Sequence, residues 1–169
     1  MGKIRLEGDI MTLVKEHDLL PIFQLHSGTG DMVGSQDYRG KKGLVVIFFD
    51  PDCDSCNDFL YEIGERYSDY QSMDAEVLAI GEGSVDEIRE IVDDPTIPFP
   101  ILADPDNNVL GHYADSTPAI FVADRYGEVR AVVKPKANEH FPDQAVILSN
   151  LELAELECPE CGVPTWPTY

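Results

Sequence analysis

Four cysteines stand in two Cys-x-x-Cys pairs, and the first pair, Cys53 and Cys56, lies where a buried strand is expected to run into a helix. At the first turn of a helix this spacing brings two sulfurs close enough to join. The first sulfur then faces backbone N–H groups that lack a helical partner, and these donors stabilise the reactive thiolate. We therefore predict that Cys53 is the exposed nucleophile and that Cys56, one turn deeper, resolves the mixed disulfide.

Three aspartates flank this pair and bear on its reactivity. Asp50, Asp52 and Asp54 oppose thiolate formation by like-charge repulsion, whereas the helix dipole favours it. A destabilised thiolate favours the disulfide form, so our hypothesis is a reductant of low potential and not a strong oxidant. A measured potential near that of strong oxidants would contradict it.

The second pair, Cys158 and Cys161, opens an irregular C-terminal tail. One Cys-x-x-Cys pair is half of a tetrahedral zinc site, so zinc would need a second chain or Cys53 and Cys56 as the other half. The alternatives to zinc binding are a second redox pair that exchanges electrons with Cys53, a structural disulfide, or free thiols. The apolar tail around Trp166 would dock on the domain or on a second copy, so a homodimer is one expectation. We predict no bound metal at the catalytic pair and no cofactor.

The elements that must position Cys53 follow from the apolar patterning. Gly43–Phe49 is continuous, apolar and rich in β-branched and aromatic residues, which predicts a central strand buried on both faces. Apolar residues at helical spacing predict a helix from Asp54 to Tyr70. The other predicted strands span 75–80, 119–123 and 128–133, and the other predicted helices span 85–92, 109–113 and 141–156. This order predicts one α/β domain over residues 1–157, with a central mixed sheet flanked by helices, and a tail over 158–169.

Composition limits the partners and the compartment. The net charge of −20, from 32 acidic and 12 basic residues among 169, would repel phosphate backbones and anionic lipid surfaces. We therefore expect neither nucleic acid nor membrane as a partner. Charged residues interrupt Met1–Leu20, so we expect no signal peptide, and no later segment is long enough to span a bilayer. The expected compartment is the cytoplasm, where paired cysteines are more often redox-active or metal-binding than structural.

Five further segments carry a family resemblance: Leu20–Leu25, Asp37–Lys41, Val45–Cys56, Phe99–Asp104 and Thr117–Asp124. Together they resemble the redoxin family, the thioredoxin-like group that includes alkyl hydroperoxide reductase and thiol-specific antioxidant (AhpC/TSA) proteins as well as dithiol reductases. The similarity covers about Leu20 to Val133. It implies a thioredoxin-like fold and an antioxidant thiol-disulfide oxidoreductase that reduces or exchanges protein disulfides through the first dithiol, supplied with electrons by an unidentified reducing partner.

The same resemblance implies a role for Thr117 and Pro118. In this superfamily a cis-proline faces the dithiol and follows a residue whose backbone contacts substrate, and Thr117-Pro118 before the apolar run 119–123 is similar to that arrangement. The resemblance therefore implies that Thr117 and Pro118 shape the substrate groove. An ordinary trans turn proline is the alternative.

Peroxiredoxins resemble this chain too, which leaves a second activity open. Their peroxidatic cysteine follows a proline and a threonine at fixed offsets, and Phe49 and Cys53 occupy those offsets before Cys56. The arginine that polarises the peroxide in those proteins would stand where Pro118 stands here. A thiol peroxidase that reduces hydroperoxides through Cys53 is therefore the alternative function. A non-enzymatic module in which the four cysteines bind zinc is a third.

Overall fold

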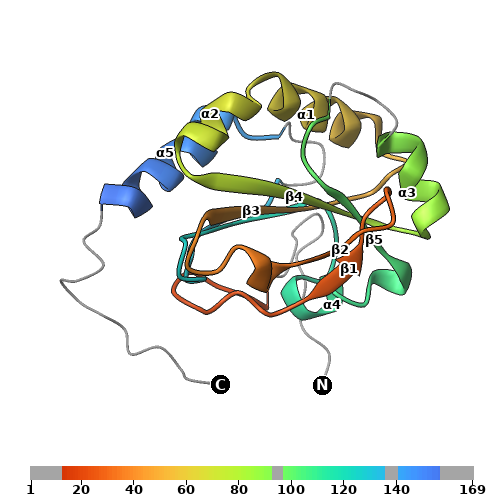
Figure 1. Ribbon diagram of the computed structural model, residues 1–169, viewed down its shortest axis with the longest axis horizontal. Helices are drawn as coiled ribbons and strands as arrows, with labels where there is room; N and C mark the ends of the chain where they lie inside the picture. Colours follow the sequence, from red (N-terminus) through yellow and green to blue (C-terminus); the bar gives the residue numbers. More distant parts are fainter. Residues whose placement is uncertain (1–12, 93–96, 136–140, 157–169) are drawn as a thin grey trace.

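A five-stranded sheet in the order β5-β4-β3-β6-β7 forms the centre of the protein (Figure 1). The computed structural model describes residues 13–92, 97–135 and 141–156. The strands are β3 (Gly43–Phe49), β4 (Ala75–Glu82), β5 (Ile101–Asp104), β6 (Ala119–Ala123) and β7 (Val129–Val133). β3 pairs in parallel with β4, as does β4 with β5, whereas β6 is antiparallel to both β3 and β7. The predicted thioredoxin-like α/β fold with a mixed sheet is confirmed.

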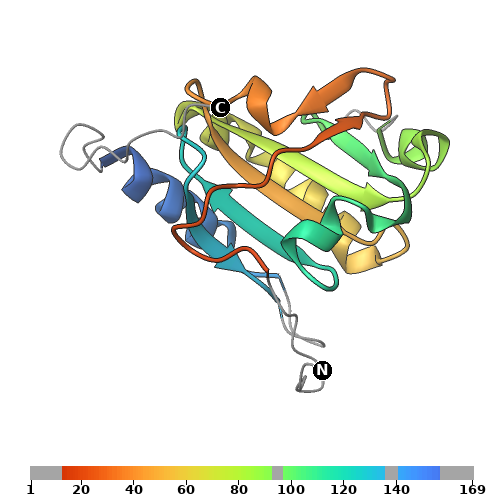
Figure 2. The same ribbon diagram turned by 90° about the horizontal axis from the view of Figure 1, so that it is seen from below.

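The central strand β3 separates two hydrophobic cores, one on each face of the sheet. All seven of its residues are buried, and successive side chains point to opposite faces, so Ile47 and Phe49 join one core while Val46 and Phe48 join the other. The first core is covered by α1 (Asp54–Glu65), α2 (Tyr67–Ser72), α3 (Val85–Val92) and α5 (Gln144–Leu156). The second is covered by α4 (Leu110–Tyr113) and the N-terminal segment (Figures 1 and 2). Helices therefore flank both faces, as predicted.

Strand β5 was not among the predicted strands, and two further features of the chain differ from the sequence-based expectation. The single helix predicted over 54–70 is two helices, because Arg66, with φ −110° and ψ 19°, ends α1 and precedes α2. A small hairpin of β1 (Gln24–His26) and β2 (Met32–Gly34) was not predicted, since each strand has only three residues and half of the six are exposed. None of the helices within the described ranges is long and apolar enough to cross a bilayer.

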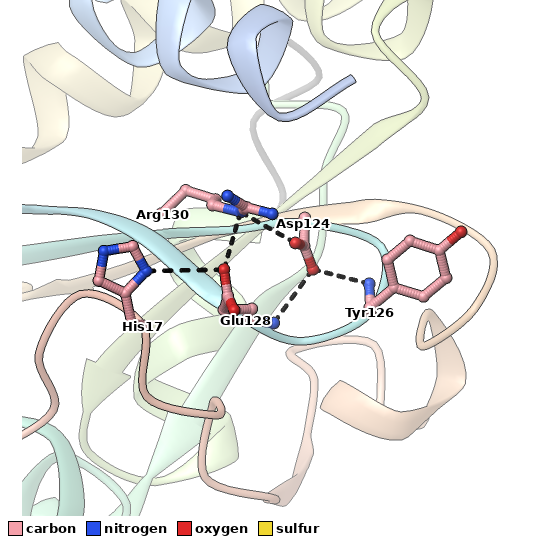
Figure 3. Close-up of polar contacts among 5 residues, drawn as sticks. All are labelled: His17, Asp124, Tyr126, Glu128 and Arg130. Atoms are coloured by element: carbon pink, nitrogen blue, oxygen red, sulfur yellow. Dashed lines mark hydrogen bonds and ion pairs between the residues drawn. The ribbon is translucent and has the colours of Figure 1, made fainter. Parts of the chain in front are cut away.

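The turn between β6 and β7 is held by a polar cluster (Figure 3). The buried carboxylate of Asp124 accepts hydrogen bonds from the backbone N–H groups of Tyr126 and Glu128 and from Nε of Arg130, at 2.8, 3.1 and 3.0 Å. Arg130 Nε also lies 3.2 Å from Oε2 of Glu128, which in turn lies 3.7 Å from Nδ1 of His17. The cluster closes the hairpin and fastens the N-terminal segment beside β7. The start of that edge strand is paired with the N-terminal segment, since the backbone of Val129 bonds to His17 and Asp18.

Candidate active site

The dithiol lies at the junction between the end of β3 and the start of α1. After Phe49 the chain turns through Asp50, Pro51 and Asp52, and the N–H of Asp52 donates to Oδ1 of Asp50 at 2.9 Å. Cys53 follows as the N-cap residue of α1, in an extended conformation with φ −90° and ψ 110°. Its N–H donates to the carbonyl of Asp50 at 3.0 Å. The turn therefore presents the Cys53 side chain at the helix N-terminus, as its sequence position predicted.

Cys53 and Cys56 are joined by a disulfide, with their Cα atoms 5.2 Å apart. Cys53 is half-buried, whereas Cys56 is 2% exposed and packs into the core beneath α1. The Cys53 sulfur accepts a hydrogen bond from the backbone N–H of Cys56 at 3.2 Å and lies 3.3 Å from Oγ of Ser55. The same donors would face a thiolate at Cys53 after reduction. The pair is a disulfide with one approachable sulfur and one buried sulfur.

Asn57 is a residue of the site that sequence reasoning missed. Its Nδ2 donates to the carbonyl of Pro51 at 3.2 Å, and its backbone N–H donates to the carbonyl of Cys53 at 3.1 Å. Both bonds fasten the turn that carries Cys53 to the first turn of α1. The Oδ1 atom of Asn57 is buried and has no hydrogen-bond partner within the described part of the chain. An amide side chain four residues after the first cysteine was the available signal, because residues i and i+4 are neighbours on a helix.

The Thr117–Pro118 peptide bond is cis, as the family resemblance implies. Pro118 directly precedes β6, whose first residue, Ala119, pairs with Phe48 near the end of β3. This register brings Pro118 to the edge of the sheet from which the chain continues to Cys53. Thr117 and Pro118 are both half-buried. Their part in substrate binding stays a prediction.

Other candidate residues fall outside this geometry. Cys158 and Cys161 lie outside the described residues, so their predicted roles in zinc binding, electron transfer or dimer contacts stay predictions. Across residues 13–92, 97–135 and 141–156, no three His, Cys, Asp or Glu side chains are grouped so that they could hold a metal ion. The four aspartates nearest the dithiol, Asp50, Asp52, Asp54 and Asp58, are all exposed.

Known proteins of two activities are similar to this chain. It is 28% identical over 124 residues to the thiol-disulfide oxidoreductase ResA of Geobacillus kaustophilus, covering 72% of this chain and 71% of that protein. It is 29% identical over 130 residues to a peroxiredoxin of Ignicoccus hospitalis, covering 68% and 55%. The crystal structure of peroxidoxin BcpB from Mycobacterium tuberculosis superposes with a TM-score of 0.73 at 15% identity, over 82% of this chain and 97% of that one.

The family model of the AhpC/TSA family matches residues 17–132, which include the dithiol, the cis-proline and all five strands of the central sheet except the last residue of β7. The match extends over more than half of the chain. Together with the disulfide between Cys53 and Cys56, it defines the chemistry as thiol-based oxidation and reduction. The chain therefore belongs to the AhpC/TSA family, as a thiol-based oxidoreductase with the thioredoxin-like fold.

Proposed function

We propose that this protein is a thiol-disulfide oxidoreductase that reduces or exchanges disulfides of other proteins through Cys53 and Cys56. The observation that carries the proposal is the disulfide itself, whose first sulfur is half-exposed at the start of α1 and whose second is buried. An approachable sulfur can react with a substrate disulfide, whereas a buried sulfur can react only with the adjacent cysteine. The similarity to a ResA thiol-disulfide oxidoreductase supports this activity.

In the proposed reaction the reduced protein donates two electrons. The Cys53 thiolate attacks one sulfur of the substrate disulfide, whose S–S bond breaks, and the first substrate thiolate leaves and takes up a proton. A mixed disulfide now joins Cys53 to the substrate. Cys56 gives up its proton, and its thiolate attacks the Cys53 sulfur, which releases the second substrate thiol and closes the Cys53–Cys56 disulfide. A reducing partner restores the dithiol by the reverse exchange.

The environment of the two sulfurs supports this division of roles. Negative charge on the Cys53 sulfur would be stabilised by the N–H of Cys56 and by the positive end of the α1 dipole. Cys56 lies in the core cluster with Phe59 and Leu60, where no substrate of protein size reaches it. Cys53 is therefore the attacking group of the proposal, and Cys56 resolves.

Thr117 and Pro118 are the residues that we assign to the substrate groove. Their position before β6, at the edge of the sheet that leads into the dithiol, supports the assignment, because a substrate segment beside Thr117 would lie next to Cys53. We also propose that the protein works in the cytoplasm. The net charge of −20 supports partners other than nucleic acid and anionic membranes.

Stopped-flow mixing of the reduced protein with a protein disulfide and, separately, with hydrogen peroxide tests the proposal. We expect fast disulfide exchange and slow peroxide consumption. Cys53→Ser should abolish exchange, whereas Cys56→Ser should stop after the first step and accumulate a mixed disulfide at Cys53 that mass spectrometry detects. Exchange that survives Cys53→Ser would contradict the assigned roles.

A thiol peroxidase that uses Cys53 is the second candidate, and the similarity to a peroxiredoxin supports it. The half-exposed Cys53 sulfur could also be oxidised by a hydroperoxide and then resolved by Cys56. Two features weigh against it: neither Cys53 nor Cys56 has the proline and threonine of the peroxiredoxin pattern upstream, and Pro118 stands in place of the arginine. Rapid peroxide turnover that is lost in Cys53→Ser would favour the peroxidase over the reductase.

A further inference from the structure

Four aspartates lie within five residues of Cys53 along the chain, and we call Asp50, Asp52, Asp54 and Asp58 the acidic rim. The first three lie in the turn and at the start of α1, and Asp58 lies one helical turn beyond Asp54 on the same side of α1. All four side chains are exposed. From residue 43 to residue 65 the chain contains no lysine or arginine. The proposed redox site therefore lies in a stretch whose charged residues are all acidic.

The charge of the acidic rim is not neutralised from within. No cation in the described ranges lies within ion-pair distance of a rim carboxylate, since the arginines that form ion pairs do so with Asp69, Asp86, Asp124 and Glu128. The hydrogen bond that Asp50 accepts from the N–H of Asp52 leaves its charge in place. The rim therefore presents up to four negative charges to an incoming molecule.

The opposite side of the site does not reverse this sign. Asp115 is exposed two residues before Thr117, on the segment that leads into the cis-proline. Lys134 directly follows β7 and is exposed. Because Val133 pairs with Ile120, Lys134 lies at the same end of the sheet as Pro118. It is two strands away from β3. Among the described residues, this one cation, two strands away, stands against four anions in the segment that carries Cys53. A molecule that approaches Cys53 meets a net negative field.

That field discriminates between substrates by their charge. Two unit charges about 7 Å apart in water change an encounter rate by roughly two- to threefold in the direction of their sign. Several rim charges acting together, after counter-ion screening, should change it by about tenfold at low ionic strength and much less at high ionic strength. The reacting groups are Cys53 and Cys56 themselves. The aspartates only bias which substrate disulfide reaches Cys53.

We infer that the acidic rim selects positively charged disulfides, so that the substrate of this site is a disulfide flanked by lysine or arginine side chains. This inference rests on the proposed exchange activity of Cys53 and Cys56. It concerns only the first encounter, in which the Cys53 thiolate meets the substrate sulfur. The two-electron balance of the exchange is unchanged.

Three small disulfides of different charge test the inference. The reduced protein is mixed with cystamine, which is dicationic, with bis(2-hydroxyethyl) disulfide, which is neutral, and with 3,3′-dithiodipropionate, which is dianionic. Each rate constant is divided by the rate constant of the same disulfide with dithiothreitol, which carries no charge besides its reacting thiolate, to remove differences in intrinsic reactivity. We expect cystamine to be preferred over dithiodipropionate by about tenfold at low ionic strength, with the preference shrinking as salt is added.

Two triple variants separate the rim from the overall charge of the protein. Asp52→Asn, Asp54→Asn and Asp58→Asn together remove three rim charges, and the preference for cystamine should fall to near unity. The matched control combines Glu16→Gln, Glu65→Gln and Asp74→Asn, which changes the net charge equally at exposed positions away from the dithiol. Glu65 lies about 18 Å along α1 from Cys53, so its Coulomb interaction with a molecule at the sulfur is less than half that of a charge about 7 Å away. This control should keep the preference.

The outcomes distinguish the inference from the function on which it rests. Exchange with all three disulfides at equal normalised rates would overturn the charge selection and leave the oxidoreductase proposal standing. Loss of the preference in the control variant as well as in the rim variant would assign it to net charge and overturn the role of the rim. Failure to reduce any of the three disulfides would overturn the proposed function together with the inference.

Discussion

The burial of the two sulfurs predicts a large difference in their reactivity after reduction. Alkylation of Cys56 requires its side chain to leave the core, where it is 2% exposed, and we estimate this step at about 1–2 kcal/mol for a side chain of this size. It also requires the first turn of α1 to open and lose at least one backbone hydrogen bond, at about 1 kcal/mol. The sum of about 2–3 kcal/mol corresponds to a rate difference that approaches a hundredfold.

The assay uses iodoacetamide and single-cysteine proteins. In a background of Cys158→Ser and Cys161→Ser, the Cys56→Ser protein leaves only Cys53 to react, and the Cys53→Ser protein leaves only Cys56. We expect alkylation of Cys53 to be about a hundredfold faster, as followed by acid quenching and mass spectrometry. Similar rates in the two proteins, or faster reaction at Cys56, would refute the assignment of Cys53 as the attacking sulfur. Matched melting temperatures would serve as the control for local unfolding.

Three further predictions concern stability. Asp104→Ala should lower the free energy of unfolding by about 2–4 kcal/mol in urea titrations, because the buried Asp104 carboxylate accepts hydrogen bonds from two backbone N–H groups at the start of α4 that would lose their partner. Gly127→Ala should cost about 1–2 kcal/mol, because φ is +87° there and a Cβ would come within 2.8 Å of the Arg39 guanidinium; an unchanged urea midpoint would contradict this. Burial raises the pKa of three tyrosines well above the ordinary value, so the folded state keeps protons that the unfolded state loses, and stability should fall as the pH rises above about 10. Urea midpoints measured from neutral to alkaline pH test this, and a flat profile would contradict burial of Tyr67, Tyr70 and Tyr113.

The elements around the dithiol could be predicted because their signals are local. The strand predicted over Gly43–Phe49 has the observed bounds, since a continuous apolar run of that length is buried on both faces only in a central strand. The helix predicted from Asp54 begins where expected but ends early. Tyr67 continues the apolar spacing of α1, yet its hydroxyl bonds Oε1 of Glu76 on the neighbouring strand at 2.6 Å. The apolar spacing therefore does not mark the end of α1, which lies at Arg66.

The sequence by itself determined that a Cys-x-x-Cys pair follows a buried strand and opens a helix, because hydrophobic periodicity and spacing act over fewer than twenty residues. The same spacing predicted an exposed Cys53 and a deeper Cys56, but only the tertiary structure decided that Cys56 packs into the core beneath α1 and that Pro118 reaches the same edge of the sheet as the end of β3. The physical reason is that these facts depend on strand register and helix packing between segments about seventy residues apart. Local patterning does not encode such contacts, and the packing of the whole core selects them.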